Sequence, residues 1–157
     1  MYKFRISTDE ELKDNCARYG ELVYGLRATE EKFALFFGKV RRLFGENDSF
    51  SDDWEYMYHY HITAEDEQGN KLYFWVYHGS GGSSVGTPFS DELPPDYQQA
   101  KKELIEYIES AEPIDYVWEG CYYDIPDNIK YTVKDGKVYV EHDFPEDMDF
   151  ENIEDFM

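Results

Sequence analysis

The sequence has few cysteines, and their spacing carries no metal or redox motif. Cys16 and Cys121 are the only two, and neither belongs to a CxxC pair or to a Cys/His cluster, so no zinc-finger or thiol-redox pattern is present. The sequence also lacks a run of about 18 apolar residues, the length that a membrane-spanning helix needs. The opening MYKFRIS has no long apolar stretch either. We expect a soluble, cytoplasmic protein.

Basic residues are scarce, and the shortage is uneven along the chain. There are 15 Lys and Arg against 35 Asp and Glu, a net charge of -20. Residues 1–42 hold nine basic and seven acidic residues, whereas residues 43–157 hold six and 28. Such a surface repels nucleic acid and anionic membrane and attracts basic proteins. We therefore predict a basic protein partner and neither direct nucleic-acid nor membrane binding, with solubility alone as the alternative explanation of the charge.

Aromatic residues are abundant, which indicates a folded core despite the charge. The 157 residues are 41% apolar and 18% aromatic, enough to bury one core without disulfides or metal. We predict a single α+β domain over residues 1–157, in which 144–157 form an acidic C-terminal tail.

Hydrophobic periodicity and turn residues predict the elements of this domain. We expect a short strand at 2–6, a helix capped by Ser7 or Thr8 and running to about Leu22, a helix after Thr29 that ends before Gly45, and a helix from about 97 to 111. Two hairpins, 54–63 with 71–78 and 130–133 with 137–141, and a strand in YVWEGCYY add to them. The predicted fold is one antiparallel sheet of about four to six strands with helices on one face and the other face partly open.

The only low-complexity stretch, GSGGSSVGTPFS at 79–90, lacks both glycine-rich nucleotide motifs, GxGxxG and GxxxxGK[ST]. No Lys or Arg occurs between residues 72 and 100 to balance a phosphate. We interpret the stretch as a mobile loop, or as an edge strand with glycine bulges.

The stretch YMYHYHIT at 56–63 raises the question of a metal site. If opposite residues of the first hairpin have numbers that sum to 137, then His59 faces His78, and His59, His61 and His78 share one face in a geometry that can hold a catalytic zinc. A turn that is one residue longer or shorter sends His78 to the other face. Leu72, Phe74 and Val76 share the predicted histidine face, and the strand offers no neighbouring carboxylate, so we favour ordinary sheet histidines. We predict no metal, no cofactor and no catalysis.

The predicted partner-binding residues combine acidic side chains with aromatic ones. The tail after Asp143 alternates acids with Phe, Met and Ile, which suits a recognition strip for a basic surface; a short helix docked on its own domain is the alternative. The predicted contacts are Asp52, Asp53, Glu55, Tyr58, Tyr60, Asp143, Glu146, Asp147, Asp149 and Glu151.

The order of these elements resembles the YezG-like immunity proteins of bacterial toxin systems. The residues that carry the resemblance are DDWEYMYHYHI followed by LYFWVYHG, the helix YQQAKKELIEYIES, and IKYTVKDGKVYVEHDFPED, and it spans about residues 30–147. The N-terminal strand and helix and the Gly/Ser loop depart from the family pattern. The resemblance implies a small cytoplasmic protein that binds a cognate toxin, often a nuclease, and blocks it.

Three functions follow from the sequence as hypotheses. The favoured one is a non-catalytic inhibitor or immunity protein that covers the basic active site of a nuclease-type toxin. An acidic structural domain, or a DNA mimic of the antirestriction type, has the same composition. A zinc enzyme that uses His59, His61 and His78 is the third.

Overall fold

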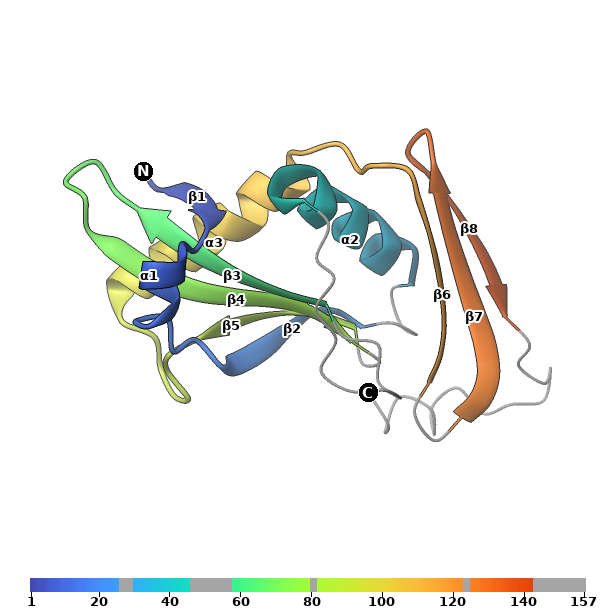
Figure 1. The fold of residues 1–157 in the computed structure, drawn as a ribbon, viewed down its shortest axis with the longest axis horizontal. Helices are drawn as coiled ribbons and strands as arrows, with labels where there is room; N and C mark the ends of the chain where they lie inside the picture. Colours follow the sequence, from blue (N-terminus) through green and yellow to red (C-terminus); the bar gives the residue numbers. More distant parts are fainter. Residues whose placement is uncertain (26–29, 46–57, 80–81, 123–124, 143–157) are drawn as a thin grey trace.

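A computed structural model describes residues 1–25, 30–45, 58–79, 82–122 and 125–142. It confirms an α+β fold, built from three helices and two antiparallel sheets (Figure 1). The larger sheet has the strand order β1-β3-β4-β5-β2. Its strands are β1 (Lys3–Ile6), β2 (Tyr19–Gly25), β3 (Tyr58–Glu65), β4 (Lys71–Gly79) and β5 (Gly82–Thr87).

The smaller sheet has the order β6-β7-β8 and lies at the opposite end of the molecule from α1 and the β3–β4 turn (Figure 1). It consists of β6 (Tyr116–Tyr122), β7 (Ile125–Lys134) and β8 (Lys137–His142). The helices are α1 (Asp9–Leu12), α2 (Glu30–Phe44) and α3 (Pro95–Glu109). Figure 1 shows α2 and α3 on the same side of the five-stranded sheet, with α2 next to the smaller sheet. The prediction of a single sheet is therefore wrong, because α2 separates the strands into two.

Helix α2 joins the two sheets because it is apolar on two adjacent stripes. Phe33 and Phe37, one turn apart, pack against Tyr116, Tyr131 and Val133 of the smaller sheet. Phe36 and Val40, on the neighbouring stripe, pack with the larger sheet and α3. Residues at spacings of three and four lie on one side of a helix. Because α2 has two such sets, it covers apolar side chains of both sheets.

Helix α3 covers the centre of the larger sheet. Its buried residues Tyr97, Ala100, Leu104 and Ile108 recur every three or four positions and contact buried side chains of β3, β4 and β5. The Glu and Lys residues of α3 occupy the remaining positions, where Lys102 and Glu106 are exposed and Lys101, Glu103 and Glu109 are half-buried.

The chain crosses α2 closely on its way from α3 to β6, at a helix position that has no side chain. The Ile114 amide donates to the Gly38 carbonyl at 3.1 Å. A Cβ atom on Gly38 would lie 2.8 Å from Pro113 Cβ and 3.3 Å from the Ile114 carbonyl oxygen. Glycine at this position therefore permits the crossing.

We expect Gly38→Val to destabilise the protein by about 2–4 kcal/mol in urea unfolding, because the connection cannot move without losing its hydrogen bond. Helix propensity alone favours valine over glycine, so it cannot cause this loss. Lys32→Val, at an exposed position of the same helix, is the matched control. Equal stabilities of the two variants would contradict the close-packing argument.

Two further predictions are corrected by the structure. The helix that begins at Thr8 ends at Leu12, and residues 19–25 form β2 instead of continuing the helix to Leu22. The glycine-rich segment forms β5 through residues 82–87, all of them buried. Since β5 lies between β4 and β2, it is an interior strand and neither a loop nor an edge.

Candidate functional site

The register of the β3–β4 hairpin differs from the predicted one by a single residue. Tyr58 pairs with His78, and His59 pairs with Tyr77. The cause is the turn from Asp66 to Asn70, in which the Asp66 carboxylate accepts hydrogen bonds from the Gln68 and Asn70 amides, both at 2.9 Å. Gly69 takes the predicted left-handed conformation, with φ 85°. The odd number of turn residues places His78 on the opposite face from His59 and His61.

His78 points into the core on the helix side of the sheet. Its side chain is 2% exposed, and its ring lies 4.3 Å from the Phe37 ring in an edge-to-face arrangement. Nδ1 and the Ser83 hydroxyl are 2.5 Å apart and share a hydrogen bond. Burial, with the Arg41 charge as a second cause, lowers the pKa of His78 to about 3. His78 is therefore a neutral core residue at ordinary pH.

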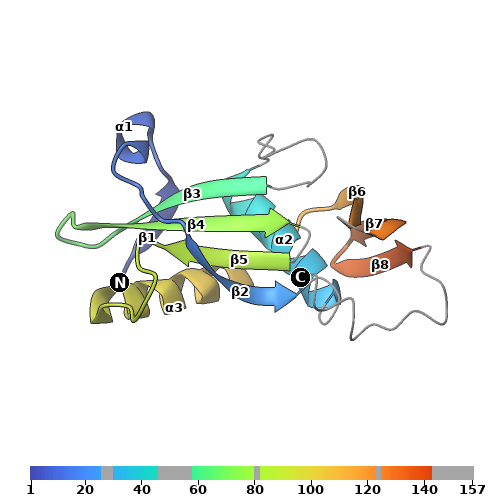
Figure 2. The ribbon, with the colours of Figure 1, turned by 90° about the horizontal axis from the view of Figure 1, so that it is seen from below.

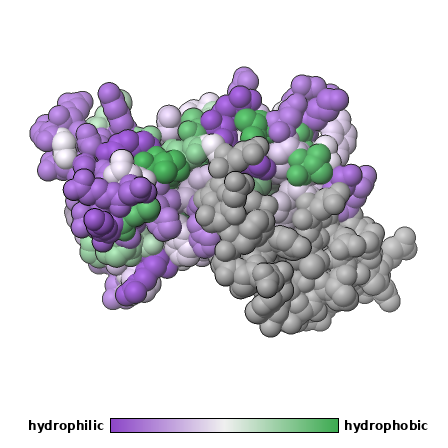
Figure 3. Space-filling model, in the orientation of Figure 1, coloured by the Kyte–Doolittle hydropathy of each residue, from purple (hydrophilic) through white to green (hydrophobic). Residues whose placement is uncertain are grey.

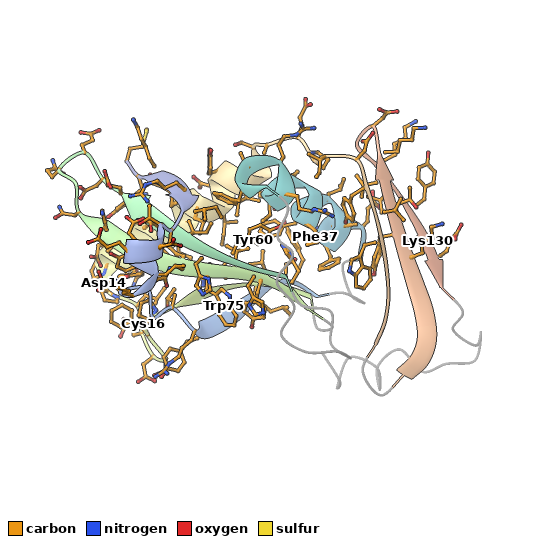
Figure 4. All side chains as sticks on the ribbon, in the orientation of Figure 1. Asp14, Cys16, Phe37, Tyr60, Trp75 and Lys130 are labelled. Atoms are coloured by element: carbon orange, nitrogen blue, oxygen red, sulfur yellow. The ribbon has the colours of Figure 1, made fainter. Side chains whose placement is uncertain are left out.

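His59 and His61 lie on the other, open face of the sheet, where the rings of both contact the Trp75 ring. The Trp75 Nε1–H donates to His59 Nδ1 at 3.0 Å, and the two ring planes are within 5° of parallel. The centroids of these two rings are 5.1 Å apart, and the His61 ring centroid lies 6.4 Å from that of Trp75 in a nearly parallel arrangement. Burial lowers the pKa of both histidines, for His59 with the charge of His61 as a second cause. Figure 4 shows Trp75 on the opposite side of the sheet from Tyr60 and Phe37.

These positions overturn the zinc hypothesis in the form that the sequence suggested. Two histidines face one side of the sheet and the third faces the core, so no single ion can be ligated by all three. Among the described residues, no group of three or more His, Cys, Asp or Glu side chains is placed to hold a metal ion.

The open face carries an aromatic cluster that rests on glycines. Tyr77 stacks on Trp75 at 4.3 Å between ring centroids. A Cβ atom on Gly20 would lie 2.5 Å from the Tyr77 hydroxyl oxygen, and one on Gly86 would lie 3.3 Å from the Trp75 ring. Two neighbouring strands thus lack side chains where these rings lie. The predicted register placed Leu72, Phe74 and Val76 on the histidine face, whereas the observed one places Trp75 and Tyr77 there.

The N-terminal segment closes one end of the open face through a buried carboxylate. Glu11 is 5% exposed and forms salt bridges with Arg5 and Lys71. It also accepts the Thr8 amide at 2.9 Å, completing a capping box. The hydrogen bonds from Arg5, ahead of those from Thr8 and Lys71, lower the pKa of Glu11 well below its usual range. Beside it, the Ser7 and Thr63 hydroxyls are 2.8 Å apart, which fixes the segment to β3.

The predicted partner-binding residues have different outcomes. Tyr60 is 2% exposed and belongs to the core between the sheet and α3, so it is withdrawn from the predicted interface. Tyr58 lies in β3 opposite His78. The acidic members of the set, at 52–55 and 143–151, lie outside the described residues, and they stay predictions.

A groove that the sequence analysis missed lies beside the first half of β2. It is a cavity of about 240 Å³ lined by residues of β2, β5, the β5–α3 connection and α3, among them Tyr19, Glu21, Phe89, Asp91, Leu93 and Lys101. We call it the edge groove, because β2 is an outermost strand of the sheet (Figure 2). One signal in the sequence points to it: residues 72–100 contain Asp91, Glu92 and Asp96 and no basic residue.

The walls of the edge groove are held by local hydrogen bonds. The Phe89 amide donates to the Thr87 hydroxyl at 3.2 Å, and the Gln98 side chain donates to the Leu93 carbonyl at 2.7 Å. The Phe89 ring packs edge-to-face on Tyr97 at 5.1 Å. These contacts fix the conformation of the β5–α3 connection.

Comparison with known proteins gives no relative: no family model, no curated protein and no solved structure matches this chain. No helix in the described part of the chain is long and apolar enough to cross a membrane. Figure 3 shows that hydrophilic side chains cover α1 and the β3–β4 turn on one face of the molecule.

Proposed function

We propose that the protein is a non-catalytic inhibitor that binds a basic protein, of the nuclease-toxin type, and blocks its active site. One observation carries the proposal, the charge. If every one of the 15 basic side chains neutralised a different acidic one, 20 of the 35 acidic side chains would still be unpaired. A strongly negative field at the surface is the consequence.

The field suits an inhibitor of enzymes that act on phosphates. A nuclease needs a basic groove to bind its substrate backbone, and carboxylates placed in that groove take the positions of phosphates. The approach of an acidic inhibitor to such a groove is accelerated by electrostatic attraction. The resemblance to YezG-like immunity proteins supports the same proposal, and the acidic residues at 52–55 and 143–151 are its predicted contacts.

The proposal predicts association that depends strongly on salt. We expect a partner recovered from the source cell at low ionic strength to be basic, and to lose its nuclease activity when an equimolar amount of this protein is added. The association rate constant, measured by stopped-flow fluorescence, should fall on the order of 100-fold between about 20 mM and 1 M NaCl as the charges are screened. A partner that binds at a rate independent of salt, or that stays fully active in the complex, would contradict the proposal.

A further inference from the structure

We propose that the edge groove, together with residues Tyr19–Leu22 of β2, is a docking site for an extended segment of the basic partner, which adds as a strand to β2 and places a Lys or Arg side chain in the groove. The inference rests on the proposed function for the charge of the partner. It goes beyond that function in naming where, and in what conformation, the partner binds.

The backbone geometry of β2 supports strand addition. Among the described strands, β2 has a neighbour on one side only, β5. An edge strand presents unpaired N–H and C=O groups that can pair with an added strand. All four residues from Tyr19 to Leu22 are exposed, and Leu22 is 55% exposed. The pairing with β5 is interrupted between Leu22 and Tyr24, and the rest of β2 is partly covered, so the accessible edge is four residues long.

The position of the groove matches the side-chain spacing of an added strand. Tyr19 and Glu21 alternate along β2 and both line the groove, so they lie on the same face of the sheet. Alternate residues of a strand paired with β2 would point to that face as well. One of them would therefore enter the groove while its backbone remained hydrogen-bonded to β2.

The chemistry of the groove favours a long cationic side chain. Asp91 is exposed and forms no ion pair with any residue that the structure describes. Phe89, 38% exposed, supplies an aromatic face, and Leu93 supplies an apolar wall for the methylene stem. Ring and carboxylate together suit a guanidinium or ammonium group on a flexible stem.

One cation, Lys101, lines the groove, and another, Arg18, precedes the lining residue Tyr19. Lys101 forms a salt bridge with Glu21, which leaves the Asp91 charge available. Arg18 lies over the Tyr19 ring, 5.3 Å from its centroid, so Phe89 and not Tyr19 is the ring for an incoming cation. The other edge strand of the larger sheet, β1, carries the exposed Lys3, which is unsuited to a basic segment.

The test uses defined peptides and the full chain. The probe is a nine-residue peptide of alternating Lys and Thr, titrated into the ¹⁵N-labelled protein and followed by amide chemical shifts, with a Glu/Thr peptide as the charge control. We expect shifts at residues 19–22 and 89–91 with the Lys peptide only. Methylating alternate backbone nitrogens of the peptide blocks pairing along one of its two edges, so one methylated version should fail to bind and the other should bind.

Substitutions distinguish binding in the edge groove from non-specific attraction of the Lys peptide to the acidic surface. Asp91→Asn should weaken the Lys peptide about three- to fivefold, and Phe89→Ala by about threefold. Glu106→Gln removes the same charge from an exposed position of α3 outside the groove and should leave the affinity unchanged. Absence of binding, shifts elsewhere, equal effects of Asp91→Asn and Glu106→Gln, or equal binding of both methylated peptides would overturn the inference.

The outcome is separable from that of the proposed function. If a basic nuclease is inhibited but its affinity does not respond to Asp91→Asn, the inhibitor function stands and this docking site fails. If the Lys peptide binds the groove but no nuclease is inhibited, the docking site stands and the inhibitor function fails.

Discussion

Replacing Phe37 by alanine should cost about 3–5 kcal/mol of unfolding free energy, the range for a large aromatic side chain removed from a core. Phe37 is 2% exposed and lies between the two sheets. Its ring is 4.3 Å from that of His78 in the larger sheet and 5.2 Å from that of Tyr116 in the smaller one. The ring therefore touches both sheets, and its loss leaves a cavity that neither can fill alone.

The same variant tests whether the two sheets unfold as one unit. Trp75 reports on the larger sheet and Trp118 on the smaller. Two proteins, each retaining only one of these two and with Trp54 also replaced, can therefore be followed by fluorescence in urea. We expect coincident transitions in the parent protein and a shift of both midpoints in Phe37→Ala. Phe37→Leu, which keeps most of the volume, is the control and should lose clearly less. A shift confined to the Trp118 signal would show that α2 does not couple the sheets.

Elements defined by local chemistry were predictable from the sequence. Asp135 and Gly136 have positive φ values of 52° and 77°, and the hairpin has the predicted register, with Val133 opposite Val138. Gly45 ends α2 with φ 86°, as its position after an apolar periodic stretch indicates. In these cases a short segment contains all the residues that determine its conformation.

Elements decided by distant contacts were not predictable in this way. The Thr8 cap forms, but the helix stops after one turn, and the Asn15 side chain then donates to the Phe74 carbonyl at 3.2 Å. This partner is 59 residues away. In the first hairpin, the hydrogen bonds of the Asp66 side chain stabilise a turn with an odd number of residues. The register of β4 on β3 is therefore shifted by one residue, and each side chain of β4 lies on the opposite face from the predicted one. The zinc hypothesis, which needs His59, His61 and His78 on one face, is wrong because of this shift.

The edge groove illustrates the same limit at the level of a site. Its residues come from β2, from β5 and the connection after it, and from α3, and they meet only because β2 pairs with β5. The sequence showed the acidic, base-free stretch but predicted residues 19–22 as helix, so the aromatic and acidic residues of the groove were never brought together.

Acid should destabilise the protein through His78. The pKa of His78 is lowered to about 3 in the folded protein, chiefly by burial, whereas the imidazole of an unfolded chain has a pKa of about 6.5. Between these values the unfolded chain binds one more proton, so stability falls as the pH falls from 6.5 toward 3. The slope due to this one group is at most about 1.4 kcal/mol per pH unit.

Other groups titrate in the same pH range. The pH dependence of the parent's stability must therefore be compared with that of a variant that lacks His78. Neutralising surface carboxylates relieves repulsion and acts in the opposite direction, whereas protonation of Glu11, whose folded pKa is lowered, adds to the loss at the acid end. The pKa values of His59 and His61 are lowered too. In His78→Gln, which can still bond to Ser83, these contributions remain and the His78 contribution disappears.

We therefore expect the difference in unfolding free energy, parent minus His78→Gln, to decrease as the pH is lowered from 7 to 4. Urea unfolding at each pH measures it, and the imidazole signals of His78 in the NMR spectrum should show no protonation over the same range. Protonation of His78 near pH 6 in the folded protein would contradict the burial argument. Because this ring contacts Phe37 and is bonded to Ser83 in β5, its protonation would loosen the contact through which α2 holds the larger sheet.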